Sequence, residues 1–188
     1  CEAAGYDVIL VETVGVGQSE TLVHSMVDFF LLLMLAGAGD ELQGIKRGIM
    51  ELADLLLINK ADGDNVKKTK MAAREYKNAM HLFPPKDNNW IPQAKICSGL
   101  HEENIHEVWE EIDKFKRHNL ANGYFEKNRS QQEIQWFVES LKDNILNHFT
   151  NTPDAKKDIE ERKNQVNKKE ISAFEAADQW MQKWILKK

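Results

Sequence analysis

The sequence predicts an α/β fold with an incomplete parallel sheet, followed by an all-helical C-terminal part. Short runs of β-branched and aliphatic residues alternate with stretches of helical periodicity along the first part of the chain, which is the pattern of a parallel sheet. After about residue 118 no run typical of a strand recurs, and apolar residues repeat at helical spacing. We therefore expect two domains, residues 1–118 with the sheet and residues 119–188 with helices.

Four apolar runs are the expected strands: Val8–Val11, Leu31–Leu35, Leu55–Ile58 and Ala94–Cys97. The helical stretches that follow them cover about residues 19–30, 45–53, 66–83 and 105–115. Parallel sheets bind their ligands at the carboxyl ends of the strands. The loops after these strands are therefore the places to search for a site.

The helical part should contain three or so helices. One apolar stripe runs from Ile134 to Phe149, Pro153 interrupts it, and further stripes continue to Trp184. Trp180 and Trp184 lie four residues apart on one helical face, which we interpret as core packing extended to a dimer seam. This part has too little apolar material to stand alone, so it should pack on something.

Composition excludes several classes of protein. The net charge of -5 argues against nucleic acid as the main partner, because phosphate binding needs a basic surface. The longest apolar run, Phe29 to Gly39, is shorter than a membrane span of about 20 residues. Cys1 and Cys97 suggest a reducing, cytoplasmic compartment rather than a disulfide scaffold. The chain begins at Cys1 rather than Met, and we expect it to be a fragment or a processed product.

The most informative motif is N-K-x-D at Asn59, Lys60 and Asp62, directly after an expected strand. Guanine presents two adjacent N–H donors that one carboxylate can accept, whereas adenine would leave that carboxylate unpaired. The stem of Lys60 can cover the base, and Asn59 can tie neighbouring loops together. The alternative interpretation is a solvated turn rich in Asn and Asp.

Two weaker motifs follow other expected strands. Residues 12–18 read E-T-V-G-V-G-Q, in which a carboxylate can hold Mg²⁺ beside a phosphate and a glycine lets backbone approach that phosphate. Residues 97–100 read C-S-G-L, a small-residue loop that can aim a backbone N–H at a guanine carbonyl. Each alone could be an ordinary turn, and their order along the chain is what gives them weight.

Several strings of the chain resemble the MeaB/ArgK family of P-loop G proteins. The most specific is G-Y-D-V-I-L-V-E-T-V-G-V-G-Q-S-E over residues 5–20, and residues 39–48, 53–55 and 59–64 also match. Members of this family assist adenosylcobalamin-dependent acyl-CoA mutases such as methylmalonyl-CoA mutase, and some have an older label as lysine/arginine/ornithine transport-system ATPases. The resemblance implies a P-loop NTPase (G-domain) sheet, GTP or GDP and Mg²⁺ as ligands, and a C-terminal arm that forms a homodimer.

The resemblance also implies roles for particular residues. Glu12 would be the Mg²⁺-side carboxylate and Gly15 the switch glycine, and Asn59, Lys60 and Asp62 would hold guanine. Residues Ser98, Gly99 and Leu100 would close over the base. The loop from Gly39 to Lys46 would be a further switch that faces the client mutase. The remaining candidates for hydrolysis, switching or partner contact are Val16, Gly17, Gln18, Asp40, Gln43 and Lys46.

Two departures from G proteins qualify this expectation. No G-x-x-x-x-G-K-[ST] occurs in the 188 residues, so the chain lacks the loop that cradles the β- and γ-phosphates and should be inactive without it. Val16 stands where Ras-like proteins place a water-orienting Gln, which suggests slow intrinsic hydrolysis. Two alternatives therefore stay open: a catalytically dead dimerisation or scaffold fragment, and an NTPase linked to amino-acid transport. The guanine-selecting motif argues against the second.

Overall fold

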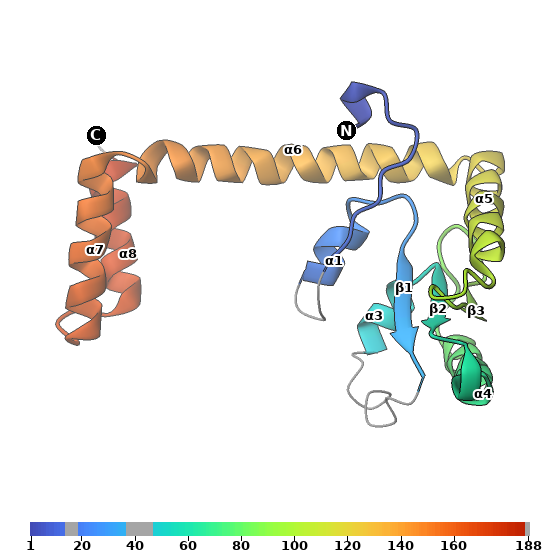
Figure 1. Cartoon of the computed structure of the whole chain (residues 1–188). Helices are drawn as coiled ribbons and strands as arrows, with labels where there is room; N and C mark the ends of the chain where they lie inside the picture. Colours follow the sequence, from blue (N-terminus) through green and yellow to red (C-terminus); the bar gives the residue numbers. More distant parts are fainter. Residues whose placement is uncertain (14–18, 37–46, 187–188) are drawn as a thin grey trace. The chain divides into compact units, whose positions relative to one another are not determined.

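We describe the protein from a computed structural model of the chain. The structure describes residues 1–13, 19–36 and 47–186. These residues form two compact units, residues 1–132 and residues 133–188 (Figure 1). The division falls later in the chain than the predicted boundary at residue 118, within helix α6 (Tyr124–Thr150).

The first unit is built on a three-stranded parallel sheet with the strand order β1-β2-β3. The strands are β1 (Leu31–Leu35), β2 (Leu55–Asn59) and β3 (Gln93–Ile96). In the register of the sheet, Leu31 lies opposite Leu55, which lies opposite Gln93. The predicted parallel α/β sheet is thus confirmed, together with the last three of the predicted strands.

The predicted strand at Val8–Val11 was wrong. These residues have no regular secondary structure and are exposed, and the side chain of Leu10 is 86% exposed. A parallel strand is held by hydrogen bonds to a neighbouring strand, and the described part of the sheet pairs no strand with this segment. An apolar run without such a neighbour does not form a strand by itself.

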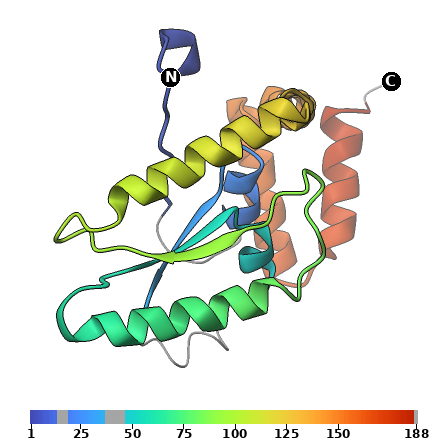
Figure 2. The same cartoon turned by 90° about the vertical axis from the view of Figure 1, so that its right-hand side faces the viewer.

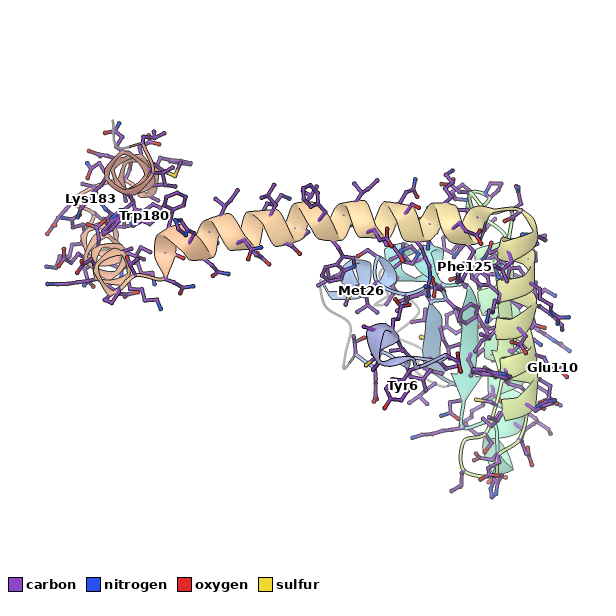
Figure 3. All side chains as sticks on the ribbon, turned by 90° about the horizontal axis from the view of Figure 1, so that it is seen from above. Tyr6, Met26, Glu110, Phe125, Trp180 and Lys183 are labelled. Carbon is purple, nitrogen blue, oxygen red and sulfur yellow. The ribbon has the colours of Figure 1, made fainter. Side chains whose placement is uncertain are left out.

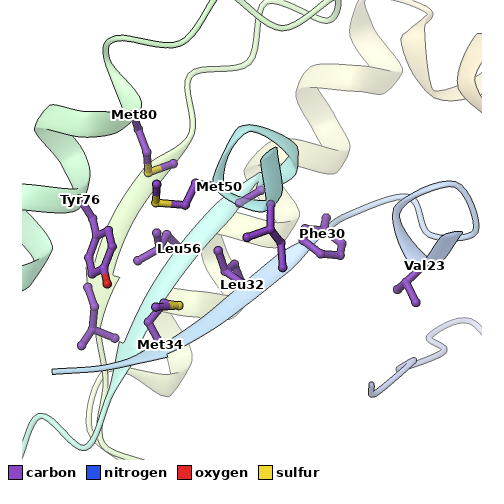
Figure 4. Packing of buried hydrophobic residues seen from close by; sticks show 11 residues of the cluster. Val23, Phe30, Leu32, Met34, Met50, Leu56, Tyr76 and Met80 are labelled. Carbon is purple, nitrogen blue, oxygen red and sulfur yellow. The ribbon is translucent and has the colours of Figure 1, made fainter. Parts of the chain in front are cut away.

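The two faces of the sheet are covered by different helices. Helix α4 (Val66–Met80) and helix α5 (Ile105–Ala121) lie on opposite sides of the strands (Figure 2). On the α4 side, alternate residues of the strands pack with α4, α3 (Arg47–Leu52) and α1 (Ser19–His24). The members of this core that Figure 4 labels are Val23, Phe30, Leu32, Met34, Met50, Leu56, Tyr76 and Met80.

The core on the α5 side is smaller. Leu55, Leu57 and Cys97 pack there against Val108 of α5. Strand β2 is buried on both faces as a result, which its continuous apolar sequence predicts. Leu33 of β1 lies beyond this core and is 59% exposed.

Some helices end at other residues than predicted. Helix α1 ends at His24, so Phe30 lies outside it. Both backbone groups of Phe30 instead form hydrogen bonds with Asp54. The Phe30 N–H donates to Asp54 Oδ2 at 2.8 Å, and the Asp54 N–H donates to the Phe30 carbonyl at 2.9 Å. A short 3₁₀ turn over Gly63–Asn65 precedes helix α4. The helix ends at Met80 rather than at the predicted Phe83.

The start of helix α6 is fastened to the segment before β1. Arg129 donates to both carboxylate oxygens of Asp28, at 2.8 and 2.6 Å, and also pairs with Glu2 at 2.9 Å. Gln132 Nε2 donates to the carbonyl of Val27 at 2.9 Å. These contacts explain why the first turns of α6 belong to the sheet unit.

The second unit contains the rest of α6, α7 (Pro153–Asn167) and α8 (Ala173–Trp184). Pro153 is the first residue of α7 as well as the interruption after α6. Thr152 caps the N-terminus of α7, and its side chain accepts a hydrogen bond from the Ala155 N–H at 3.2 Å. Figure 3 labels Trp180 and Lys183 of α8. Among the described helices, none has both the length and the apolar character that crossing a bilayer requires.

Candidate functional site

Two loops meet at the carboxyl ends of β2 and β3, and Asn59 joins them. Asn59 Oδ1 accepts a hydrogen bond from the N–H of Gly99 at 3.0 Å and from the N–H of Lys60 at 2.7 Å. The thiol of Cys97 lies 3.6 Å from the same oxygen. Burial raises the pKa of the Cys97 thiol, so this group stays protonated and donates. The side chain of Asn59 therefore fixes the distance between the two loops.

A second link joins Asp62 to Ser98. The hydroxyl of Ser98 donates to Asp62 Oδ2 at 2.5 Å and accepts from the N–H of His101 at 3.2 Å. Ser98 is fully buried, and its backbone exchanges two hydrogen bonds with Glu103, at 3.0 and 3.1 Å. Because Ser98 is held so firmly, it sets the orientation of the Asp62 carboxylate.

The arrangement leaves Asp62 able to bind a further donor pair. Asp62 is only half-buried, and within the described residues its Oδ1 atom has no hydrogen-bond partner. An ionised carboxylate accepts only, and it has about four lone-pair positions. The chemistry that fits is recognition of adjacent N–H groups on a planar ligand, beside the exposed Lys60.

Backbone bonds strengthen the junction between the loops. The Ala61 N–H donates to the Cys97 carbonyl, and the Cys97 N–H donates to the Ile58 carbonyl, both at 2.9 Å. Asn65 Nδ2 donates to the carbonyl of Lys60 at 3.0 Å. The sequence did not point to Asn65, because an asparagine before a helix is typical of an N-cap.

Hydrogen bonds link five of the predicted site residues, and the side chains of Leu100 and Glu12 take no part in these links. Asn59, Lys60, Asp62, Ser98 and Gly99 are linked as described above. Leu100 is 79% exposed, and Glu12 lies in an exposed irregular segment. No hydrogen bond or ion pair within the described residues connects Leu100 or Glu12 with the other five. The predicted residues Gly15, Val16, Gly17, Gln18, Asp40, Gln43 and Lys46 lie outside the described residues.

Two hollows of the described surface are lined by residues other than 59–62 and 98–100. A groove of about 540 Å³ is lined by residues that include Trp90, Lys95 and His118. A second, of about 370 Å³, lies beside Lys70 and Arg74. Across the described part of the chain, no three His, Cys, Asp or Glu side chains gather as a metal site.

The chain matches a known family over most of its length. The family model described as methylmalonyl Co-A mutase-associated GTPase MeaB matches residues 1–154. A solved structure described as a LAO/AO transport system kinase superposes with a TM-score of 0.71 at 40% identity, covering 97% of this chain and 58% of that one. This likeness agrees with the predicted P-loop NTPase type of sheet.

Curated relatives agree with the family match. The chain is 48% identical over 149 residues to the GTPase ArgK of Escherichia coli, covering 79% of this chain and 45% of that protein. It is 43% identical over 178 residues to a putative GTPase of Caulobacter vibrioides, covering 95% of this chain and 54% of that protein. It is 40% identical over 178 residues to the mitochondrial methylmalonic aciduria type A homolog of Mus musculus, covering 95% and 43% respectively. The chain thus spans about half the length of these relatives.

Proposed function

The chain belongs to the MeaB family of methylmalonyl-CoA mutase-associated GTPases, and we propose that the junction of residues 59–62 with residues 98–100 binds the guanine base of GTP or GDP. The observation that supports this proposal best is the Asp62 carboxylate, oriented by the hydroxyl of buried Ser98 at 2.5 Å and otherwise open to a ligand. Asn59 and Lys60 are the other proposed binding residues, and the backbone of Gly99 lies beside Asn59.

The selectivity of such a site follows from hydrogen bonding. The N1–H and the exocyclic amino group of guanine both donate to Asp62, while adenine offers no adjacent pair and leaves a desolvated carboxylate unpaired. A binding site that loses hydrogen bonds in this way rejects the wrong ligand strongly. Lys60 is exposed, so its aliphatic stem is free to cover one face of the base.

GTP hydrolysis is proposed for the protein in combination with a phosphate-binding loop, which these 188 residues do not contain. Mg²⁺ commonly binds through one carboxylate and the phosphates of the nucleotide, and Glu12 is our proposed carboxylate. The cation would neutralise charge on the phosphates. Gly15, Gln43 and Lys46 remain proposed contributors to hydrolysis, and Val16, Gly17, Gln18 and Asp40 to switching. We expect the 188 residues alone to be inactive in hydrolysis.

The proposed role in the cell is to assist an adenosylcobalamin-dependent acyl-CoA mutase of the methylmalonyl-CoA mutase type, in the cytoplasm. The family name associates its members with that mutase. Homodimerisation through the C-terminal helices is also proposed, because α6 exposes large apolar side chains such as Ile134, Phe137 and Leu146. We propose no nucleic-acid or membrane partner.

Nucleotide binding by the protein in its full encoded length is the test. A fluorescent GDP analogue should bind at least about 100-fold more tightly than the matching ADP analogue. Asp62→Asn should weaken GDP binding about ten- to 100-fold and improve binding of xanthosine diphosphate, which carries a carbonyl where guanine has its amino group. Asp64→Asn, an exposed neighbour, should leave both affinities unchanged.

Other results would favour other functions. Equal or tighter binding of ADP would overturn guanine selection and favour the ATPase linked to amino-acid transport. Absence of binding to any nucleotide would favour a scaffold whose loops keep the shape of a guanine site without using it. An unchanged GDP affinity in Asp62→Asn would remove Asp62 from the proposed site.

A further inference from the structure

Lys60 has a backbone conformation that non-glycine residues rarely adopt. Its φ of 60° lies in the left-handed region, where the β-carbon crowds the following peptide. Two hydrogen bonds hold this conformation from its two ends. The Lys60 N–H donates to Asn59 Oδ1 at 2.7 Å, and its carbonyl accepts from Asn65 Nδ2 at 3.0 Å. Disfavoured conformations persist only where the surrounding contacts determine them.

Asn65 is itself fixed in a way that suits this task. It occupies the N-cap position of α4, but its side chain makes no capping bond and turns to Lys60 instead. Its N–H donates to the carbonyl of Asp62 at 2.9 Å. Its own carbonyl accepts from the hydroxyl of fully buried Thr69 at 3.2 Å. One residue therefore contacts both Lys60 and Asp62 and is anchored to the helix behind them.

We propose that Asn65 is a positioning residue for base recognition, whose amide holds Lys60 in the left-handed conformation and so sets the geometry of the loop from Asn59 to Asp62. This inference rests on the proposed guanine site. Asn65 itself need not touch the nucleotide, because its hydrogen bonds act on the backbone of the residues that do.

The test uses Asn65→Asp in the protein in its full encoded length. This substitution keeps the shape of the side chain and suits a helix N-cap, but it removes the donor to the Lys60 carbonyl. Asn78→Asp makes the same change at an exposed position of α4 and serves as the matched control. We expect the dissociation constant for GDP to rise about three- to ten-fold in Asn65→Asp and less than about two-fold in Asn78→Asp.

A double-mutant cycle separates positioning from a general loss of structure. Glycine adopts positive φ without the β-carbon clash, so the Lys60→Gly background should no longer need Asn65. The effect of Asn65→Asp on GDP affinity should fall below about two-fold there. An equally large effect in both backgrounds would overturn the proposal.

Hydrogen exchange of the nucleotide-free protein completes the test independently of binding. The amides of Lys60 and Gly99, both bonded to Asn59, should exchange faster in Asn65→Asp by roughly ten-fold and at an unchanged rate in Asn78→Asp. If the unmodified protein binds no guanine nucleotide, the proposed function fails, and the exchange rates still decide whether Asn65 positions the loop. Unchanged exchange in Asn65→Asp would overturn the inference.

Discussion

Residues 1–132 and residues 133–188 bury different kinds of side chain. In the sheet unit the most deeply buried large side chains include Leu55, Leu56 and Ile58 of β2. Among the described residues of the helical unit, the buried positions are Ala155, Ala176 and Asp158. Asp158 accepts hydrogen bonds from Lys183 and Trp184 of α8 at 2.8 and 3.0 Å.

This difference shows how each unit is stabilised. Apolar burial is non-directional and grows with the area removed from water, whereas a buried carboxylate stabilises only while its donors stay in place. The sheet unit should therefore depend on side-chain volume, and the helical unit on charge and hydrogen bonding. Substitutions in each unit can break or sharpen this contrast.

The largest expected effect belongs to Leu56→Ala. Leu56 is 0% exposed in the core on the α4 side of the sheet, so truncation leaves a cavity and should lower the free energy of unfolding by about 3 kcal/mol. NMR spectra recorded in increasing urea would follow each unit separately. Leu82→Ala, at a position 79% exposed, is the control and should change little. A loss below about 1 kcal/mol in Leu56→Ala would contradict the role of apolar volume.

The second effect concerns Asp158 and pH. Burial alone would raise the pKa of Asp158, but the hydrogen bonds from Lys183, Trp184 and Arg162 together lower it from 3.8 to about 2. Because the folded-state pKa is depressed, this stabilisation is complete above about pH 4 and is lost as the pH falls towards 2. It amounts to about 2 kcal/mol.

Asp158→Asn should remove that stabilisation at neutral pH. It should also reduce the change in stability of the helical unit between pH 4 and pH 2. Thermal unfolding of the helical unit at a series of pH values would measure both changes. Asp178→Asn, exposed on α8, is the matched control. The contrast between the units would be lost if the two variants unfolded alike at every pH.

A smaller effect is expected where charge stabilises the sheet unit. Arg129 bonds Asp28 with two donors, and an ammonium group in its place cannot form the same pair. The Arg129 and Asp28 side chains are 41% and 33% exposed, so solvent screens the pair, and Arg129→Lys should cost about 1 kcal/mol of unfolding free energy in urea. Arg74→Lys is the exposed control. A cost as large as that of Leu56→Ala would show that charge matters as much as volume in this unit.

The smallest effect is expected at Gly99. A β-carbon built there would lie 3.6 and 3.7 Å from the Asn59 amide atoms, which is ordinary contact. Gly99→Ala should change the free energy of unfolding by less than about 0.5 kcal/mol and leave GDP affinity within about two-fold. Calorimetry and GDP titration would measure these values. A large loss of stability or of GDP affinity would mean that the junction tolerates a β-carbon at residue 99 less well than the contact distances suggest.

The sequence predicted features that depend on neighbours close in the chain. The unbroken apolar run Leu55–Ile58 predicts a strand, which the structure confirms as β2, and the chemistry of Asn59 suggests a tie between loops. Val8–Val11 has a similar composition but no strand partner in the described sheet, and no local signal distinguishes the two cases. Local pattern identifies a candidate strand, while pairing decides it.

Contacts between distant residues escaped prediction. Asp158 gains its importance from Lys183 and Trp184, which reach it only after α7 and α8 have packed. Asn65 lies directly before α4, and the turn of its amide towards Lys60 is visible only in three dimensions. The sequence suggests the residue types of the proposed guanine site, but not the residues that hold them in place.

The bonds from Asn59 to Gly99 and from Ser98 to Asp62 join the two loops through the chain's own residues. A base-binding half that is held together by such internal bonds loses little conformational entropy when its ligand binds. In the proposed site it would contact the guanine base, which GDP and GTP have in common. If guanine binds as proposed, this preorganised half would anchor either nucleotide equally well, and the signal that distinguishes them would have to arise at the phosphates.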